Sequence, residues 1–455
     1  MLGQHHHRQS SSDISTFPEI ILTSLQTPQD DEHLRNKTLI LDVEGGLLRS
    51  PSIFPYFMLV AIEAGSFLRG LILLCLYPLL CCLPQEVELQ IMVIVCFMGL
   101  SEEKVARVAR ATLPKYFLED VGREGFEVLR GMKRVTGVCS LLPRIMVEPF
   151  LKEYMGLEVV VGREVKMIKG RYVGLLEKES EGKLEQAKFD ETEMIGLGCS
   201  SSYFGYDHHQ LFSWCKEVYL VTPEEKRKWS PLPRDQYPRP LIFHDGRLAF
   251  RPTPQATIAM FMWLPVALPL TLLRTLIFLN LPYPIAVAIG SVIGVTTRVI
   301  NSPVHTGQVG SEPHAQPSSQ GHLYVCNHRT LLDPVYISAM LNKQVSAVTY
   351  SVSRVTELIS PIRTVRMFHG TSTGKSKYLD HFYFFMNPRP AYDVQFMDKM
   401  PTKMVIDGKR CESYEVANFV QGEIGRILGF QSTKLTRKEK YLRLAGNEGF
   451  ADTKE

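Results

Sequence analysis

The stretch Thr38-Leu39-Ile40-Leu41-Asp42-Val43-Glu44-Gly45-Gly46 decides the fold of the first half of the chain. Its short apolar run predicts a buried strand, and the acidic, glycine-bearing segment after it predicts a loop at the carboxyl end of that strand. Parallel α/β sheets present functional carboxylates at this position. We therefore expect an α/β domain with Asp42 and Glu44 at the end of its first strand.

Further elements of the same domain follow along the chain. Charged and apolar residues alternate at helical spacing over 104–130. Further strands are expected at 135–142, 157–162, 172–176 and 194–197, with a helix around 147–154. Residues 1–36 are polar, lack the apolar core of a signal peptide and are expected to be disordered. Their three adjacent histidines lack a fourth metal ligand.

Composition excludes several classes of protein. The chain has 455 residues, enough for about three domains. Lys+Arg 51 against Asp+Glu 47 gives a net charge of +4, too balanced for a nucleic-acid binder held by phosphate contacts. Hydrophobic residues at 45% exclude a wholly disordered chain. Nine cysteines without repeated spacing argue against a disulfide scaffold and a metal site, and favour a reducing, cytosol-facing setting.

Four apolar runs predict membrane association. Within the insert at 54–100, the run 54–84 is almost continuously apolar apart from Glu63 and Arg69, and a second run spans 91–100. They predict either a membrane span or a re-entrant or interfacial helix pair. Runs 256–279 and 281–295 are joined by a very short connection, which predicts a membrane hairpin within 256–300. The alternative for that hairpin is a pair of helices buried in a soluble domain.

The segment between these parts, 224–255, is rich in charge and proline and is expected to be a linker. Its basic cluster Lys226-Arg227-Lys228 has two interpretations. It can touch anionic lipid, or it can belong to a solvated loop.

The octapeptide Asn327-His328-Arg329-Thr330-Leu331-Leu332-Asp333-Pro334 points to chemistry. It follows an expected strand at 323–326, so that His328 would lie at a strand end. Pro334 suits the first position of a helix and Asp333 its N-cap, and the turn before them lets the carboxylate approach the imidazole. Such a pair can remove a proton from an alcohol that attacks a thioester. The same spacing also arises by chance, and a capping aspartate needs no catalytic role.

With its flanking residues, the octapeptide resembles the first motif of glycerolipid acyltransferases. More closely, the chain resembles the land-plant glycerol-3-phosphate acyltransferases that form sn-2 acyl products for cutin and suberin. The resemblance covers almost everything after residue 36. The stretches that carry it are Met146-Val147-Glu148-Pro149-Phe150, Ile242-Phe243-His244, Arg251-Pro252-Thr253-Pro254, residues 326–334, 357–361 and 386–390, Thr436-Arg437-Lys438 and Leu444-Ala445-Gly446.

The resemblance implies a membrane-embedded enzyme with two α/β domains. A domain similar to haloacid-dehalogenase (HAD-like) phosphatases at 37–223 would precede the hairpin and a glycerolipid acyltransferase (PlsC-like) domain at 301–455. The implied substrates are acyl-CoA and glycerol 3-phosphate, acylated at the sn-2 hydroxyl, with no cofactor. His328 would be the general base and Asp333 its orienting partner. The implied product feeds cutin, suberin or membrane glycerolipid synthesis, and the implied place is the endoplasmic reticulum with the site facing the cytosol, or alternatively a mitochondrial membrane.

The phosphatase-like half departs from its superfamily pattern. HAD phosphatases need Asp-x-Asp followed by glycine and threonine, where one aspartate attacks phosphorus, the other handles a proton, and both help to hold Mg²⁺. Here Asp42 keeps the first position, Glu44 replaces the second acid, and the threonine is absent. Ser140 is the expected phosphate contact of the second motif. We expect a degenerate phosphatase site without a metal, so that the product keeps its phosphate.

Two more motifs of that superfamily have only weak counterparts. Lys166 or Lys169 could serve as the third-motif lysine. The acidic metal loop is replaced by Cys199-Ser200-Ser201-Ser202, and its first carboxylate comes only at Asp207.

The acyltransferase half also departs from its family, because internal blocks are missing. Family members follow the His/Asp motif with an Arg-Asp-Arg block, a Pro-Glu-Gly-Thr block and a Val-Pro-Val strand. In this chain residues 357–366 run directly into Met367-Phe368-His369-Gly370-Thr371-Ser372, and no Pro-Glu-Gly occurs. This pattern predicts an internal deletion in the domain that would hold the glycerol phosphate.

The remaining candidates for substrate binding have competing interpretations. Arg329 can hold a phosphate or form a surface ion pair. Lys375 and Lys377 can hold a phosphate or lie in a solvated turn. The aromatic segment 382–386 can line an acyl channel or pack in a core. Two further function classes stay open: a catalytically impaired, truncated membrane protein of the same family, and a HAD-type phosphatase.

Overall fold

In the computed structural model, the described residues are 37–177, 194–199, 215–300, 325–327, 333, 336–337, 340, 367–369, 379–397, 405–406, 409–429 and 433–445. The chain divides into two compact units. Unit 1 comprises Met1–His244 and Arg251–Pro254, and unit 2 comprises Asp245–Phe250 and Gln255–Glu455.

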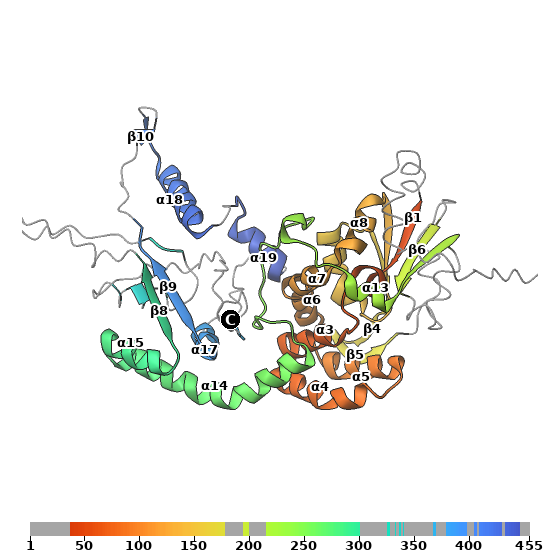
Figure 1. Ribbon diagram of the computed structural model, residues 1–455, viewed down its shortest axis with the longest axis horizontal. Coiled ribbons are helices and arrows are strands. Elements are labelled where there is room, and N and C mark those ends of the chain that lie inside the picture. The colour runs from red at the N-terminus through yellow and green to blue at the C-terminus, as the bar shows by residue number, and fades with distance from the viewer. Residues whose placement is uncertain are drawn as a thin grey trace, which may run out of the picture. The chain divides into compact units, whose positions relative to one another are not determined.

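A five-stranded parallel sheet forms the centre of unit 1, with the strand order β3-β2-β1-β6-β7 (Figure 1). Every residue of β1 is buried, because the central strand of a parallel sheet is covered on both faces. The carboxyl ends of β1, β2 and β6 lie at the same end of the sheet. The strands are β1 (Thr38–Asp42), β2 (Arg134–Cys139), β3 (Val159–Gly162), β6 (Met194–Cys199) and β7 (Glu217–Val221).

Helices and one hairpin complete the described part of unit 1. The hairpin pairs β4 (Val165–Ile168) with β5 (Arg171–Leu176) in antiparallel fashion. The helical elements are η1 (Val43–Leu47), α3 (Phe54–Leu59), η2 (Val60–Gly65), α4 (Phe67–Leu80), α5 (Gln85–Phe97), α6 (Glu102–Ala111), α7 (Leu113–Asp120), α8 (Arg123–Gly131), α9 (Arg144–Phe150), η3 (Leu151–Met155), α13 (Pro223–Lys228) and η4 (Arg234–Gln236).

These elements confirm much of the expected order. The expected strands at 38–41, 135–142, 157–162 and 194–197 correspond to β1, β2, β3 and β6, although β2 already ends at Cys139. The expected strand at 172–176 forms β5, which lies in the hairpin and not in the parallel sheet. The helical region 104–130 forms three helices, α6, α7 and α8, since Pro114 and Gly122 interrupt it.

The apolar insert 54–100 does not form one continuous helix. The first helical turns break at Gly65, and Ser66 caps α4 by accepting a hydrogen bond from the Arg69 backbone N–H. Helix α4 has 14 residues, fewer than the roughly 20 that a span needs. Its exposed face nevertheless carries Leu68 and Leu79. No helix of the insert therefore reaches the length of a span.

The start of the insert belongs to the core of unit 1. The ring of Tyr56 on α3 stacks on Phe117 of α7 with centroids 4.4 Å apart, and Phe117 stacks on Phe150 of α9 at 5.0 Å. All six residues of α3 are buried. An apolar composition alone cannot separate this core helix from a membrane helix.

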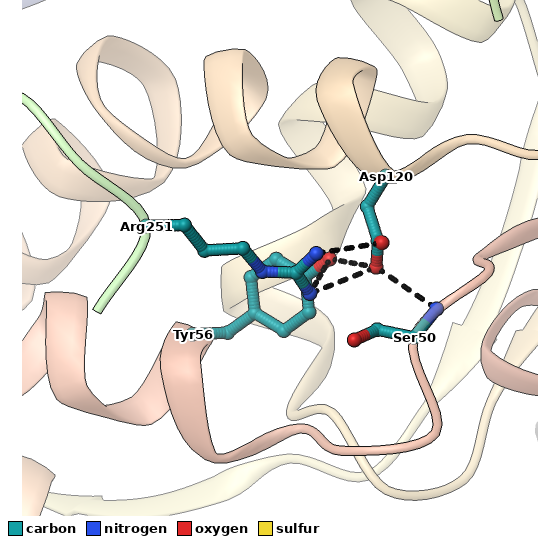
Figure 2. Close-up of polar contacts among 4 residues, drawn as sticks. All are labelled: Ser50, Tyr56, Asp120 and Arg251. Atoms are coloured by element: carbon teal, nitrogen blue, oxygen red, sulfur yellow. Dashed lines mark hydrogen bonds and ion pairs between the residues drawn. The ribbon is translucent and has the colours of Figure 1, made fainter. Parts of the chain in front are cut away.

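A buried ion pair fixes the segment that leads out of unit 1 (Figure 2). The Arg251 guanidinium donates to both carboxylate oxygens of Asp120, at 2.7 and 3.0 Å. Tyr56 donates its hydroxyl to the same carboxylate at 2.6 Å, and the Ser50 backbone N–H does so at 3.3 Å. Because Asp120 is only 1% exposed, the fork of Arg251 supplies the countercharge that its burial requires.

Unit 2 is built around a long apolar helix and a pair of parallel strands. Helix α14 has 27 residues, and among the described residues it is the one helix long and apolar enough to cross a membrane. Strand β8 pairs in parallel with β9, from Thr296 opposite Ala391 to Ile300 opposite Gln395. The elements are α14 (Pro254–Asn280), α15 (Tyr283–Val292), β8 (Thr296–Ile300), α17 (Asp380–Phe385), β9 (Ala391–Gln395), β10 (Val405–Ile406), β11 (Lys409–Arg410), α18 (Ser413–Leu428) and α19 (Arg437–Ala445).

The second arm of the expected hairpin is short. Helix α15 has 10 residues, and the chain then turns into β8 within the range expected to be membrane hairpin. Val325 and Cys326, part of the expected strand at 323–326, lie outside any strand. Phe385 and Met386 are buried, and Phe385 stacks on Phe278 of α14 at 5.7 Å, which favours core packing for segment 382–386.

Arg274 explains how a charge is accommodated inside the apolar helix α14. The residue is fully buried, and its guanidinium donates to the backbone carbonyls of Ile293, Phe385, Asn387 and Pro388. Unpaired carbonyls at the end of α15 and after α17 are thereby satisfied by one side chain. The arginine joins these segments to α14.

Asn387 performs a similar task for the segment that follows the expected deletion. Its side-chain oxygen accepts hydrogen bonds from the backbone N–H groups of Met367 and Phe368, at 2.7 and 2.9 Å. Its amide group donates to the carbonyls of Phe368, Tyr383 and Phe384. The residues just after the expected junction are thus anchored to the end of α17.

The ion pair of Figure 2 leads to a first prediction. Replacing Arg251 with Met should lower the free energy of unfolding by about 3 kcal/mol, because Asp120 keeps its charge in a buried place without a cation. The measurement is a guanidinium titration of the full chain in detergent. Arg123→Met, which breaks an exposed i,i+4 pair with Glu127, is the matched control and should change little. Equal losses in the two variants would contradict the role given to Arg251.

Candidate functional site

Three sequence-predicted residues meet at the carboxyl end of the parallel sheet in unit 1. Asp42 is the last residue of β1, Glu44 lies in the turn η1 that follows, and Ser140 comes directly after β2. All three are buried. The strand order places β1 beside β2, so the two loops adjoin.

The Glu44 carboxyl group points into the backbone of the β2 loop. Its Oε1 accepts hydrogen bonds from the N–H groups of Leu141 at 3.0 Å and Leu142 at 2.7 Å, and its Oε2 accepts one from Ser140 at 3.4 Å. Two effects raise the pKa of Glu44 to about 8: burial, which is the larger, and the negative charge of Asp42. The group is therefore mostly protonated at neutral pH.

Two further residues hold this arrangement in place. The Lys226 ammonium group, from helix α13, donates to the backbone carbonyl of Glu44 and is buried. Gly45 has no room for a side chain, since a Cβ there would lie 2.1 Å from Asp42 Oδ2 and 2.6 Å from the Cys199 nitrogen. The β1 loop therefore lies close against Asp42 and the end of β6.

The residues present do not fit a Mg²⁺ ion, which the resemblance to HAD phosphatases would require. Both oxygens of Glu44 are taken up by backbone N–H groups, and a protonated carboxyl group is a poor ligand for a hard cation. Among the described residues no group of three or more His, Cys, Asp or Glu side chains is placed to hold a metal. Asp42 Oδ2 and Ser140 Oγ are buried and make no hydrogen bond within that part of the chain.

In unit 2, the structure describes one member of the expected His/Asp pair. Asp333 is 2% exposed and lies in a helix. The Tyr392 hydroxyl, from strand β9, donates to Asp333 Oδ1 at 2.6 Å. Burial is the largest of the effects that raise the pKa of Tyr392 well above its usual range, and the charge of Asp333 is the next. The phenol therefore stays protonated and remains a donor.

The Tyr392 ring is itself held firmly. It stacks on Tyr336 with centroids 4.0 Å apart and an interplanar angle of 5°. Tyr336 also packs against Phe278 of α14 at 6.2 Å. The orientation of the Asp333 carboxylate is thereby tied to β9 and α14. His328, Arg329, Lys375 and Lys377 lie outside the described residues.

Comparison with known proteins identifies the family. The family model described as "Glycerol-3-phosphate acyltransferase RAM2-like, HAD-like domain" matches residues 38–221. The chain is 40% identical over 495 residues to the "Probable glycerol-3-phosphate acyltransferase 2" of Arabidopsis thaliana, with 93% of this chain and 92% of that protein covered. The chain belongs to the plant glycerol-3-phosphate acyltransferase family.

Other members of the glycerol-3-phosphate acyltransferase family match over similar lengths. The "Probable glycerol-3-phosphate acyltransferase 3" of Arabidopsis thaliana is 39% identical, with 91% of each chain covered. The "Glycerol-3-phosphate acyltransferase RAM2" of Petunia hybrida is 34% identical, with 90% of this chain and 98% of that protein covered. Among solved structures, a phosphoserine phosphatase is 16% identical with a TM-score of 0.27, covering 43% of this chain and 91% of that one. The expected HAD-like α/β domain is confirmed by the family model and the parallel sheet.

The structure gathers some predicted residues and separates others. Glu44 contacts Ser140, and Asp42 lies near enough to Glu44 to raise its pKa. Lys166 and Lys169, expected as alternatives for the third-motif lysine, lie exposed on the β4–β5 hairpin. Cys199 ends β6, whereas Ser200 to Ser202 and Asp207 lie outside the described residues.

The sequence did not indicate two side chains that contact the candidate residues, Lys226 and Tyr392. The solvated-loop interpretation of Lys226 is wrong, because this lysine is buried and reaches the site. The sequence before Lys226 could have indicated this helix. Thr222-Pro223-Glu224-Glu225 is a capping box, which starts α13 within the expected linker. Tyr392 carried no comparable signal, since it lies far from Asp333 in sequence.

The raised pKa of Glu44 leads to a second prediction. A carboxyl group with a pKa of about 8 in the fold and an ordinary value after unfolding stabilises the fold below about pH 4.5, and this contribution is lost progressively toward pH 8. Glu44→Gln imitates the protonated form. Its unfolding midpoint should therefore fall less than that of the wild type between these two pH values.

Glu44→Ala is the matched control for this experiment. It should also flatten the pH dependence, but it should lower the unfolding midpoint at every pH, because the loop N–H groups lose their acceptor. Thermal unfolding followed by near-ultraviolet circular dichroism measures both variants. An unchanged pH slope in Glu44→Gln would show that Glu44 is ionised in the fold.

Proposed function

We propose that the chain transfers a fatty acyl group from acyl-CoA to the sn-2 hydroxyl of glycerol 3-phosphate. Membership of the family supports the reaction class. The observation that carries the assignment of residues is that Asp333 is buried and accepts a hydrogen bond from the Tyr392 hydroxyl. Asp333 lies five residues after His328 in the sequence. A buried carboxylate held by a fixed donor is what a general-base histidine needs as an orienting partner.

In the proposed step, His328 accepts the proton of the sn-2 hydroxyl while the oxygen attacks the thioester carbonyl. Collapse of the tetrahedral intermediate breaks the carbon–sulfur bond, and the proton passes from His328 to the departing CoA sulfur. Asp333 stabilises the imidazolium form in between. No covalent acyl-enzyme and no metal is needed. Arg329, next to the base, is the proposed contact for the substrate phosphate.

Unit 1 is proposed to take no part in bond breaking. Glu44 is turned toward backbone N–H groups, and the residues present do not fit Mg²⁺, so hydrolysis of a phosphate ester has no support there. The phosphatase alternative is accordingly not favoured. The product would keep its phosphate as a 2-acyl lysophosphatidic acid, a precursor for cutin, suberin or membrane glycerolipids.

Helix α14 is the proposed membrane element. Its 27 residues exceed the roughly 20 that cross a bilayer, and Met262, Leu272 and Leu279 are exposed along it. A site next to this helix would meet acyl-CoA where that amphiphile concentrates. The endoplasmic reticulum, with the site facing the cytosol, is the proposed place, and a mitochondrial membrane is the alternative. In this proposal 224–255 links the HAD-like domain to a hairpin at 256–300 and the acyltransferase domain at 301–455.

An internal deletion remains part of the proposal. The alignment with the first Arabidopsis relative runs over 495 positions, which is more than the 455 residues of this chain, so part of that relative has no counterpart here. The missing blocks would hold the glycerol phosphate.

The second candidate function is therefore a catalytically impaired member of the family. Sequencing the transcript across the codons of Arg366 and Met367 distinguishes a real junction from a gene-model error.

The third prediction tests the general base. In the purified chain, given labelled glycerol 3-phosphate and acyl-CoA, His328→Ala should abolish formation of labelled lipid without changing the circular dichroism spectrum, because the proposed acceptor of the hydroxyl proton is removed. Equal rates in variant and wild type would refute the assignment. No labelled lipid from the wild type, beside an active family member as control, would favour the impaired candidate.

The fourth prediction concerns the support of Asp333. Tyr392→Phe should lower kcat about tenfold, since a hydrogen bond to a buried charged group is lost. The more basic carboxylate should also raise the pKa of His328 and move the acidic limb of the pH–rate profile upward. Tyr336→Phe keeps the stacked rings and is the matched control, with no such movement. A Tyr392→Phe profile that matches the wild type would contradict this role.

A further inference from the structure

The β2 loop of unit 1 forms a cradle with the geometry of an anion site. Three consecutive backbone N–H groups, from Ser140, Leu141 and Leu142, converge on one carboxyl group. Successive N–H groups that point to one place form concave sites that bind anions. Here the acceptor comes from the chain itself, since it is Glu44 of the neighbouring loop.

A second observation also indicates a ligand site. The Ser140 hydroxyl is buried in a residue only 8% exposed, and among the described residues it makes no hydrogen bond. A buried hydroxyl without a partner is costly, and native folds rarely keep one. Lys226 adds a buried positive charge at the Glu44 backbone. The surroundings therefore hold more donors than the Glu44 carboxyl group uses.

The length of the Glu44 side chain matters for this contact. A Cβ at Gly45 would meet Asp42 Oδ2 and the Cys199 nitrogen, so the β1 loop lies close to the end of β6, on the side away from β2. The contact with the β2 loop is made by the Glu44 side chain. A shorter residue at this position would leave the three N–H groups without their acceptor.

We propose that the Glu44 carboxyl group is an internal ligand that closes an oxyanion cradle made of the 140–142 N–H groups and the Ser140 hydroxyl. The wild-type chain consequently does not bind phosphate at this place, and removal of the carboxyl group opens a site for a tetrahedral oxyanion. The charge of Asp42 opposes such an anion, so its neutralisation strengthens binding. This proposal does not depend on the acyl transfer assigned to unit 2.

The experiment measures thermal unfolding of the full chain in detergent with rising inorganic phosphate, balanced by chloride to constant ionic strength. Glu44→Ala should unfold at higher temperature as phosphate rises, because a ligand that binds only the fold stabilises it. Wild type and Glu44→Gln should show no phosphate-dependent shift. Asp42→Asn in the Glu44→Ala background should enlarge the shift, and Ser140→Ala in that background should reduce it.

Several outcomes would overturn the proposal. One is an absent shift in folded Glu44→Ala, and another is an equal shift in the wild type. A shift that Ser140→Ala leaves unchanged would place the phosphate elsewhere on the chain. If Glu44→Ala does not fold, Glu44→Ser takes its place, and broadening of the ³¹P resonance of phosphate by that variant but not by wild type gives the same decision.

Discussion

The hydrogen bonds between the Glu44 carboxyl group and the backbone of residues 140–142 determine what unit 1 can do. They join the loops after β1 and β2 at the end of the sheet where α/β proteins carry their chemistry. The Glu44 carboxyl group fills this place and is mostly neutral. Lys226 donates a hydrogen bond to the backbone carbonyl of the same residue. The HAD-like unit thus keeps its fold while the Glu44 carboxyl group occupies the end of the sheet, and the proposed acyl transfer is assigned to unit 2.

Unit 2 relies on buried polar side chains in an otherwise apolar setting. Arg274 satisfies carbonyls from two segments, Asn387 holds the residues after the expected junction, and Tyr392 holds Asp333. Each of these contacts joins parts of the chain that are distant in sequence. Since an apolar environment makes an unsatisfied polar group expensive, the contacts specify one arrangement around α14. The buried carboxylate proposed to orient His328 is set by this arrangement.

The sequence predicted the features that depend on local pattern. The apolar run before Asp42 became the central strand, and the carboxylates appeared at its end, because period and turn residues are local properties. It did not predict which part of the 54–100 insert is core, since apolar residues look alike in a protein interior and in a membrane. The burial of Lys226 and the bond from Tyr392 to Asp333 depend on long-range packing and could not be derived from spacing. His328 and Arg329 lie outside the described residues, so their roles stay predictions.

One measurement tests the division of labour between the two units most directly. Glycerol 3-phosphate labelled with ³²P and ¹⁴C is incubated with acyl-CoA, Mg²⁺ and the purified chain, and both labels are counted in the extracted lipid. The account predicts labelled lipid in which the ratio of the two labels equals that of the substrate. Lipid that carries ¹⁴C but has lost ³²P would contradict it, because unit 1 would then hydrolyse the phosphate ester.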